Sequence, residues 1–488
     1  MGEIASAAEQ NASRRAAPPL LYMLIAVVAL ATAASGPYAT NLPAVAISVG
    51  AYCLLPIILP SARLRRSHLV GPANWGLLYF GLTLIVMPVV VIWSGPRPGA
   101  LRLLPSDLYI NLALLLNTLA FIAFAIGLSI PARARTLLPH PILPVFDIGV
   151  VYCMLGFVGM LLAFGSVSGI LDYFGNPAAA LLARESEPTT IGAAAATFLR
   201  PFLMVGPVLV WSWWARDHGG TAPAVARWVR TGVVILVITL AGATFSFNRA
   251  AVLTPIIALI AMYSRTIRRI SAPFLIGMGC VALSAALAAG TFRSSNVDAG
   301  DALADPAIRD ALARAVDPVE QLQIYGGAPQ FLGFLLEAND FSDTNYWGRT
   351  LLASALLPVP ILGKPLRDQS GVVLFNRLIY GDGSVVDQVI PFQGELFLNF
   401  HIPGVVVAFV LLGIAMRRLE IRIDSSRDPV EQYAVMYIAI WLCFLILGSL
   451  ASVSQIFVYF CWPIYVYAVL RWASSARAQH RGTLLAPT

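Results

Sequence analysis

Apolar runs long enough to cross a lipid bilayer recur along almost the whole chain, and they constrain its fold more than any other feature. A transmembrane helix needs about 20 apolar residues. Hydrophobic residues make up 58% of the 488 residues and charged residues only 12%, whereas a soluble domain carries roughly 25% charged residues. Backbone groups inside lipid must find partners within their own segment, so these runs predict helices. We therefore expect an all-α fold, a polytopic membrane helix bundle.

Run length predicts about 12 transmembrane helices. The expected spans are residues 18–36, 41–60, 73–94, 108–130, 145–165, 193–215, 229–247, 250–264, 272–292, 396–416, 432–450 and 452–470. The predicted segments are a disordered N-terminus at 1–17, a membrane bundle at 18–292, a large helical loop at 293–395, the last membrane helices at 396–470 and a tail at 471–488. The first run also resembles the apolar core of a signal peptide. Because the next run follows almost at once, we interpret it as an uncleaved helix.

The basic residues between the spans fall on one side of this arrangement. They are Arg14, Arg15, Arg63, Arg65, Arg66, Arg133, Arg135, Arg216, Arg227, Arg230, Arg265, Arg268, Arg269, Arg417, Arg418, Arg422, Arg427, Arg471, Arg477 and Arg481. Cytoplasmic loops are rich in arginine and lysine, so both termini are expected to be cytoplasmic. The loops at 95–107, 166–192 and 293–395 are then external. This asymmetry explains the net charge of +7, and we expect no nucleic-acid partner.

The long external loop contains several helix signals. Asp305-Pro306 and Asp317-Pro318 each predict a helix start, and the second helix should bend at Gly326-Gly327. We expect these helices to cover the external end of the bundle. After Tyr346-Trp347-Gly348-Arg349, prolines interrupt an apolar run before it can span, which predicts a half-inserted segment.

Glu395 and Asn399 close this loop at the start of the next predicted span. They are four residues apart, so they share one face of a helix. An ionisable group at the edge of the hydrocarbon region is costly, which makes Glu395 a functional candidate. The alternative is a carboxylate that only caps the helix and interacts with its dipole.

Cationic side chains on the external side form the second group of candidates. They are Arg249, Arg293, Arg184, Arg349, Lys364, Arg367 and Arg377. Guanidinium groups bind phosphate in a bidentate manner, which suits a pyrophosphate headgroup. The alternatives are internal salt bridges to Glu395 or Asp343 and, for Arg184, an interfacial side chain that extends toward the headgroups. Arg200 lies deeper in its helix, where an arginine requires an anionic partner.

The order of these features resembles a known family, the bacterial oligosaccharide repeat-unit polymerases of the O-antigen polymerase-like group. The matching pieces are Gly348 before a short apolar run, the proline-rich turn into Lys364-Pro365, the sequence from Gly394 to Gly404, and the Asn248-Arg249 turn. The span count and the single large external loop also agree. His401 replaces a glycine that is usual in the family, and Val359 and Ile361 occupy a region that often carries an arginine.

The resemblance implies a multi-span, inverting glycosyltransferase in the bacterial inner membrane, active in O-antigen, capsule or exopolysaccharide synthesis. Its donor would be a glycan on undecaprenyl pyrophosphate, and its acceptor another lipid-linked repeat unit. Arg249 and Arg293 would stabilise the leaving pyrophosphate, and Glu395 or else His401 would be the general base. Membrane lipid, a chain-length regulator and a flippase are the further partners that it implies. No metal and no cofactor are expected.

Three alternatives remain open at this level, and one of them is a structural scaffold for a polysaccharide export complex, which would not explain the arginines on the external side. A ligase that transfers a lipid-linked glycan to another acceptor would use nearly the same residues. A non-catalytic polysaccharide transporter or flippase would instead favour charges deep in several spans and two related halves.

Overall fold

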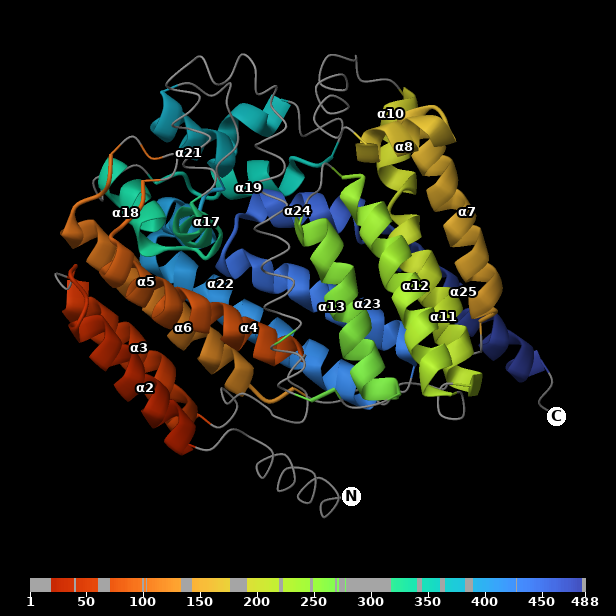
Figure 1. Ribbon diagram of the computed structural model, residues 1–488, viewed down its shortest axis with the longest axis horizontal. Coiled ribbons are helices and arrows are strands. Elements are labelled where there is room, and N and C mark those ends of the chain that lie inside the picture. Colours follow the sequence, from red (N-terminus) through yellow and green to blue (C-terminus); the bar gives the residue numbers. More distant parts are fainter. Residues whose placement is uncertain are drawn as a thin grey trace. The chain divides into compact units, whose positions relative to one another are not determined.

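The computed structural model describes most of the chain. The described residues are 19–38, 41–59, 71–98, 101, 103–132, 143–175, 191–218, 223–245, 249–267, 270–271, 277, 317–339, 345–359, 365–381, 389–426 and 428–484. Within these ranges every regular element is a helix. The chain forms two compact units (Figure 1), the first built from residues 1–133, 306–421 and 439–455, and the second from the remainder.

Apolar composition makes this a polytopic helical membrane protein. Seven described helices are long and apolar enough to cross a membrane, or eight if the bent pair Leu450–Tyr459 and Trp462–Ser474 forms one span. The seven agree with predicted spans, and the bent pair agrees with 452–470. The predictions at 18–36, 41–60 and 250–264 correspond to shorter apolar helices. The expected span at 272–292 lies outside the described residues, so the count of about 12 is not confirmed.

The first unit contains the N-terminal helices and most of the predicted external loop. Its elements are α2 (Pro19–Ala34), α3 (Leu42–Ile58), α4 (Pro72–Gly81), the π-helical turn η4 (Leu82–Val86), α5 (Met87–Ser94), α6 (Asp107–Ser129), α17 (Pro318–Tyr325), α18 (Pro329–Ala338), α19 (Arg349–Leu356), the 3₁₀ turn η5 (Arg367–Gln369), α21 (Gly371–Tyr380), most of α22 (Phe392–Ser425), the 3₁₀ turn η6 (Phe444–Ile446) and the start of α24 (Leu450–Tyr459).

The predicted cover over this unit is present. Asp317 caps α17 by accepting a hydrogen bond from Val319 N, and Gly327, at a φ of 69°, turns the chain into α18. α17 packs on α5 and α18 packs on α6, so the loop helices lie at one end of the membrane helices (Figure 1). The expected helix at 305–316 lies outside the described residues.

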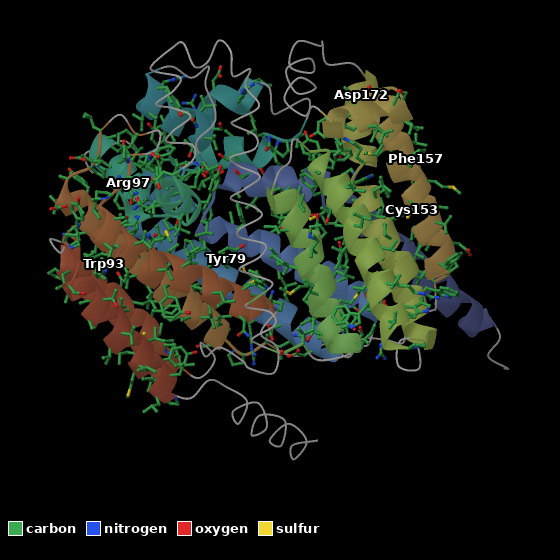
Figure 2. The ribbon with its side chains drawn as sticks, viewed as in Figure 1. Tyr79, Trp93, Arg97, Cys153, Phe157 and Asp172 are labelled. Carbon is green, nitrogen blue, oxygen red and sulfur yellow. The ribbon has the colours of Figure 1, made fainter. Side chains whose placement is uncertain are left out.

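Hydrogen bonds of the buried Gln323 amide and of the Glu337 carboxylate join the cover to the loop after α5. Gln323 Oε1 accepts a hydrogen bond from the backbone N–H of Arg97 at 2.8 Å, and its Nε2 donates to Gly95 O at 2.9 Å. Figure 2 shows Arg97 beside these cover helices. Glu337 Oε2 accepts from Ser106 N at 3.0 Å. The two loops that the basic residues predict to share one face therefore meet in the first unit.

The second unit is built around close helix contacts. It contains α7 (Val145–Phe164), α8 (Val167–Gly175), α10 (Ile191–Leu199), α11 (Phe202–His218), α12 (Ala224–Ala243), α13 (Arg249–Thr266), α25 (Trp462–Leu484) and the start of α23 (Pro429–Cys443). Figure 2 labels Cys153 and Phe157 along α7. A Cβ at Gly156 would lie only 2.5 Å from Leu203 N, so glycine lets α7 and α11 approach backbone to backbone, a common device in membrane helices.

Arg200 lies at the break between α10 and α11, buried in the second unit. Its Nη1 donates to Thr244 O at 2.8 Å, and its guanidinium stacks 4.2 Å from the centre of the Phe245 ring. Thr244 ends α12, where carbonyl groups carry partial negative charge. These two contacts are with neutral groups that carry partial negative charge, a helix C-terminus and an aromatic face; the anionic partner expected for this deep arginine stays a prediction.

Segments predicted to share the cytoplasmic face also meet. Arg265 Nη1 lies 2.7 Å from Asp424 Oδ1, and Arg471 Nη1 lies 3.1 Å from Asp428 Oδ2. Arg471 and Arg422 also pair with Glu431. These contacts place three predicted cytoplasmic segments together within the second unit. Which face is cytoplasmic remains a prediction.

Candidate functional site

The helix that carries Glu395 is broken at His401. His401 has a φ of 52° and a ψ of −149°, so α22 consists of a short helix up to Phe400 and a long membrane helix after the kink. Pro403 has no N–H to donate and fits the first turn of the second part. We expected Glu395 and Asn399 at the start of the membrane span. They lie instead in a separate short helix that precedes it.

The Glu395 carboxylate is fully buried in the first unit. Ser354 Oγ, from α19, donates to its Oε1 at 2.6 Å, and the same hydroxyl oxygen accepts a hydrogen bond from Gly371 N at 3.3 Å. Oε2 has no hydrogen-bond partner of good geometry among the described residues. Glu395 also forms no ion pair there, so the salt-bridge alternative is not supported for the described arginines.

Three helix N-termini surround this carboxylate. The backbone amides of Gly371 and Leu450, which begin α21 and α24, face it, and Glu395 itself lies in the first turn of α22. Partial positive charge at a helix N-terminus stabilises a nearby anion. Gly371 is required here, because a Cβ would meet the carboxylate Oε1. The arrangement offsets part of the cost of burying an acid.

Asn399 holds the neighbouring turn in place. Its Oδ1 accepts from Gly348 N at 2.9 Å, and its Nδ2 donates to Thr350 Oγ1 at 2.6 Å and to Glu395 O at 2.7 Å. Asn399 and Thr350 are both buried. Glu395 and Asn399 therefore share one helix face, as predicted, and both side chains form hydrogen bonds with residues of α19. The Asn399 amide is occupied by contacts within the protein, including the backbone of Gly348 and Glu395.

Three of the predicted arginines lie on the elements that cover Glu395. Arg349, Arg367 and Arg377 are exposed, and they belong to α19, η5 and α21, which pack against one another. Arg349 Nε donates to Gln369 Oε1 at 2.9 Å. The protein therefore presents guanidinium groups on the outside of a short-helix layer and a carboxylate on its inside.

For the remaining predicted site residues, the structure describes no contact with Glu395 or with the residues that surround it. Arg184, Arg293 and Lys364 lie outside the described residues. Arg249 begins α13 in the second unit, but its side chain is not described. His401 lies at the kink, partly exposed, with its ring edge-on to Phe397 at a centroid distance of 5.4 Å.

Sequence reasoning did not identify Ser354, Thr350 or Gly371. Each is a small residue in or beside a short apolar helix, where serine, threonine and glycine are common without any function. Their partners lie far along the chain, so no local pattern marks them. The predicted interruption of the apolar run is present, because α19 ends at Leu356 just before Pro358; insertion of this segment halfway into the membrane stays a prediction.

Chemically, this cluster can hold an anion on its outer surface and accept a proton at Oε2 if the layer opens. Comparison with protein-family models, curated proteins and solved structures finds no match to the chain. The fold and the site together define a polytopic helical membrane protein with a buried carboxylate beneath a cationic layer of short helices.

Proposed function

We propose that the protein is an inverting membrane glycosyltransferase that polymerises glycan repeat units carried on undecaprenyl pyrophosphate at the outer face of the bacterial inner membrane. The observation that carries the proposal is the buried Glu395 carboxylate, whose Oε2 accepts no hydrogen bond of good geometry from the described residues, beneath a layer that exposes Arg349, Arg367 and Arg377. Such a pairing of a base and an anion site suits transfer of a sugar from a charged leaving group.

In the proposed reaction, the acceptor hydroxyl attacks the anomeric carbon of the donor as the bond to pyrophosphate breaks. Glu395 Oε2 takes the hydroxyl proton. The arginines stabilise the negative charge that develops on the leaving pyrophosphate, which lowers the barrier because the charge is larger in the transition state than in the donor. Glu395 is 0% exposed, so the acceptor reaches it only when α19 or α21 moves aside.

The same chemistry would serve a ligase, since the two activities differ only in the acceptor. A polymerase produces a ladder of repeat numbers, and a ligase produces a single transfer. The experiment below separates them by its product.

The test is glycan chain-length profiling in a deletion strain complemented with wild type, Glu395→Gln or Glu420→Gln, with membrane levels of each protein measured. Glutamine retains the shape of the side chain but cannot take the proton. Glu420 is the matched control, because it is also buried on α22 and accepts a backbone hydrogen bond from Ala73 N at 3.1 Å.

We expect Glu395→Gln to lose the ladder and Glu420→Gln to retain it. A full ladder with Glu395→Gln would refute the role of this carboxylate. An unchanged ladder in the deletion strain would refute the polymerase itself.

A further inference from the structure

Two residues with a positive φ lie close to the hydrogen bond between Gly348 N and Asn399 Oδ1, one near its donor and one near its acceptor. Among the residues that the structure describes, Trp347 (φ 48°) and His401 (φ 52°) are the only non-glycine residues with a positive φ. Trp347 directly precedes Gly348, whose N–H donates to Asn399, and His401 follows Asn399 by two positions. A bulky residue in this conformation is strained, and such residues concentrate at functional sites.

The turn that carries Trp347 is held at several points. Tyr346 N donates to Leu398 O at 3.1 Å, Trp347 N donates to Asn345 Oδ1 at 3.0 Å, and Arg349 N donates to Tyr346 O at 2.9 Å. Together with the Asn399 contact, these hydrogen bonds fix the backbone on both sides of Trp347. The surrounding structure therefore maintains a conformation that the tryptophan itself disfavours.

The indole that this turn presents is largely uncovered. Trp347 is 78% exposed, whereas the next residues, Gly348 and Thr350, are half-buried and buried. Arg349, also exposed, follows it and is oriented by Gln369. An exposed indole thus lies on the turn that leads into α19, and two residues along the chain α19 begins with an exposed guanidinium that binds the Gln369 amide.

We propose that Trp347 is a stacking platform for a pyranose ring of the glycan, an inference that rests on the proposed function and assigns it a substrate-binding residue. One face of a pyranose presents C–H groups that pack on an aromatic ring, while its hydroxyl groups point sideways toward hydrogen-bonding groups. The indole supplies that flat apolar surface, with an N–H at its edge. Gln369 and Arg349 supply polar groups on the same layer.

Membrane anchoring is the competing role for an exposed tryptophan. Anchoring needs no particular backbone conformation. Trp472, 73% exposed, lies on the regular helix α25, as expected for a residue that needs only to be exposed. A strained turn held by four hydrogen bonds fixes the backbone that carries the indole, and so the point on the surface where the ring is presented, which a stacked ligand requires and a fluid headgroup layer does not.

The experiment measures binding of the repeat-unit oligosaccharide, released from the producing strain's polysaccharide by hydrolysis, to the full-length protein in lipid nanodiscs. Saturation-transfer NMR compares wild type with Trp347→Phe, Trp347→Gly and Trp472→Ala. Glycine accepts a φ of 48° without strain, so Trp347→Gly removes the ring and leaves the turn intact. Thermal unfolding of each variant is measured alongside.

We expect Trp347→Gly to weaken binding roughly tenfold, in line with the loss of one aromatic contact of about 1.4 kcal/mol. Trp347→Phe should retain most of the affinity, and Trp472→Ala should match wild type. Equal binding by wild type and Trp347→Gly, or no binding by wild type, would overturn the platform. A fall in thermal stability with unchanged binding would identify a membrane anchor instead. This binding needs no catalysis, so its result is separate from the chain-length test of the polymerase.

Discussion

Replacing Asn399 by leucine should release the turn that carries Trp347. The amide makes three hydrogen bonds from a fully buried position, at 2.9, 2.6 and 2.7 Å. Each net hydrogen bond contributes about 1 kcal/mol, and a buried partner left without one costs more. The Thr350 oxygen loses the donor of one hydrogen bond, and the Gly348 N–H, fixed in the backbone, loses its acceptor. We therefore expect the free energy needed to open this turn to fall by about 3 kcal/mol.

The measurement is hydrogen–deuterium exchange of the peptide that contains Trp347 and Gly348, with the protein in nanodiscs. A loss of about 3 kcal/mol corresponds to exchange faster by roughly a hundredfold, if the turn opens by breaking these bonds. Thr350→Val is the matched control, because it removes only one of the three bonds and should accelerate exchange by roughly tenfold or less. Exchange in Asn399→Leu that equals wild type would refute the claim that Asn399 holds the turn.

Three further predictions concern the same unit. Trp347→Gly should raise the thermal stability, because relief of a positive φ gains about 1 kcal/mol; a lower melting temperature would contradict the strain. Gly348→Ala should lower it, since Gly348 has a φ of 83° and a Cβ would lie 3.0 Å from Phe400 Cζ; unchanged unfolding would argue against this geometry. Ser354→Ala should reduce polymer yield by roughly tenfold through the lost hydrogen bond to Glu395, with normal protein levels on immunoblots; full yield would show that Ser354 does not position the carboxylate.

The sequence predicts the parts of this fold that depend on local physics. Asp317-Pro318 predicted a helix start, and the structure confirms it, because an N-terminal cap and a proline act within one turn. The bend at Gly326-Gly327 is also confirmed, because glycine adopts the positive φ that a turn requires. Apolar run length likewise located the long membrane helices, since the thickness of the hydrocarbon region fixes their length.

The features that the sequence did not predict depend on contacts between residues far apart in the chain. The kink at His401 was not predicted, because a histidine adopts a positive φ only when its surroundings impose it. Ser354 and Glu395 are 41 positions apart, and nothing near either residue marks the other. Periodicity places Glu395 and Asn399 on one face, but it cannot distinguish an amide that binds the protein's own turn from one that binds a substrate.

The two ends of α22 show why Glu395 is the stronger candidate for chemistry. Glu395 and Glu420 are both buried glutamates on this helix. Glu420 accepts a hydrogen bond from the first turn of α4, at an end where we find no strained residue among those described. Around Glu395 the protein maintains two positive-φ residues and a carboxylate oxygen that accepts no hydrogen bond of good geometry from the described residues. Each of these features lowers stability. A fold selected for stability alone would not concentrate them at one end, so this end of α22 is where function is expected.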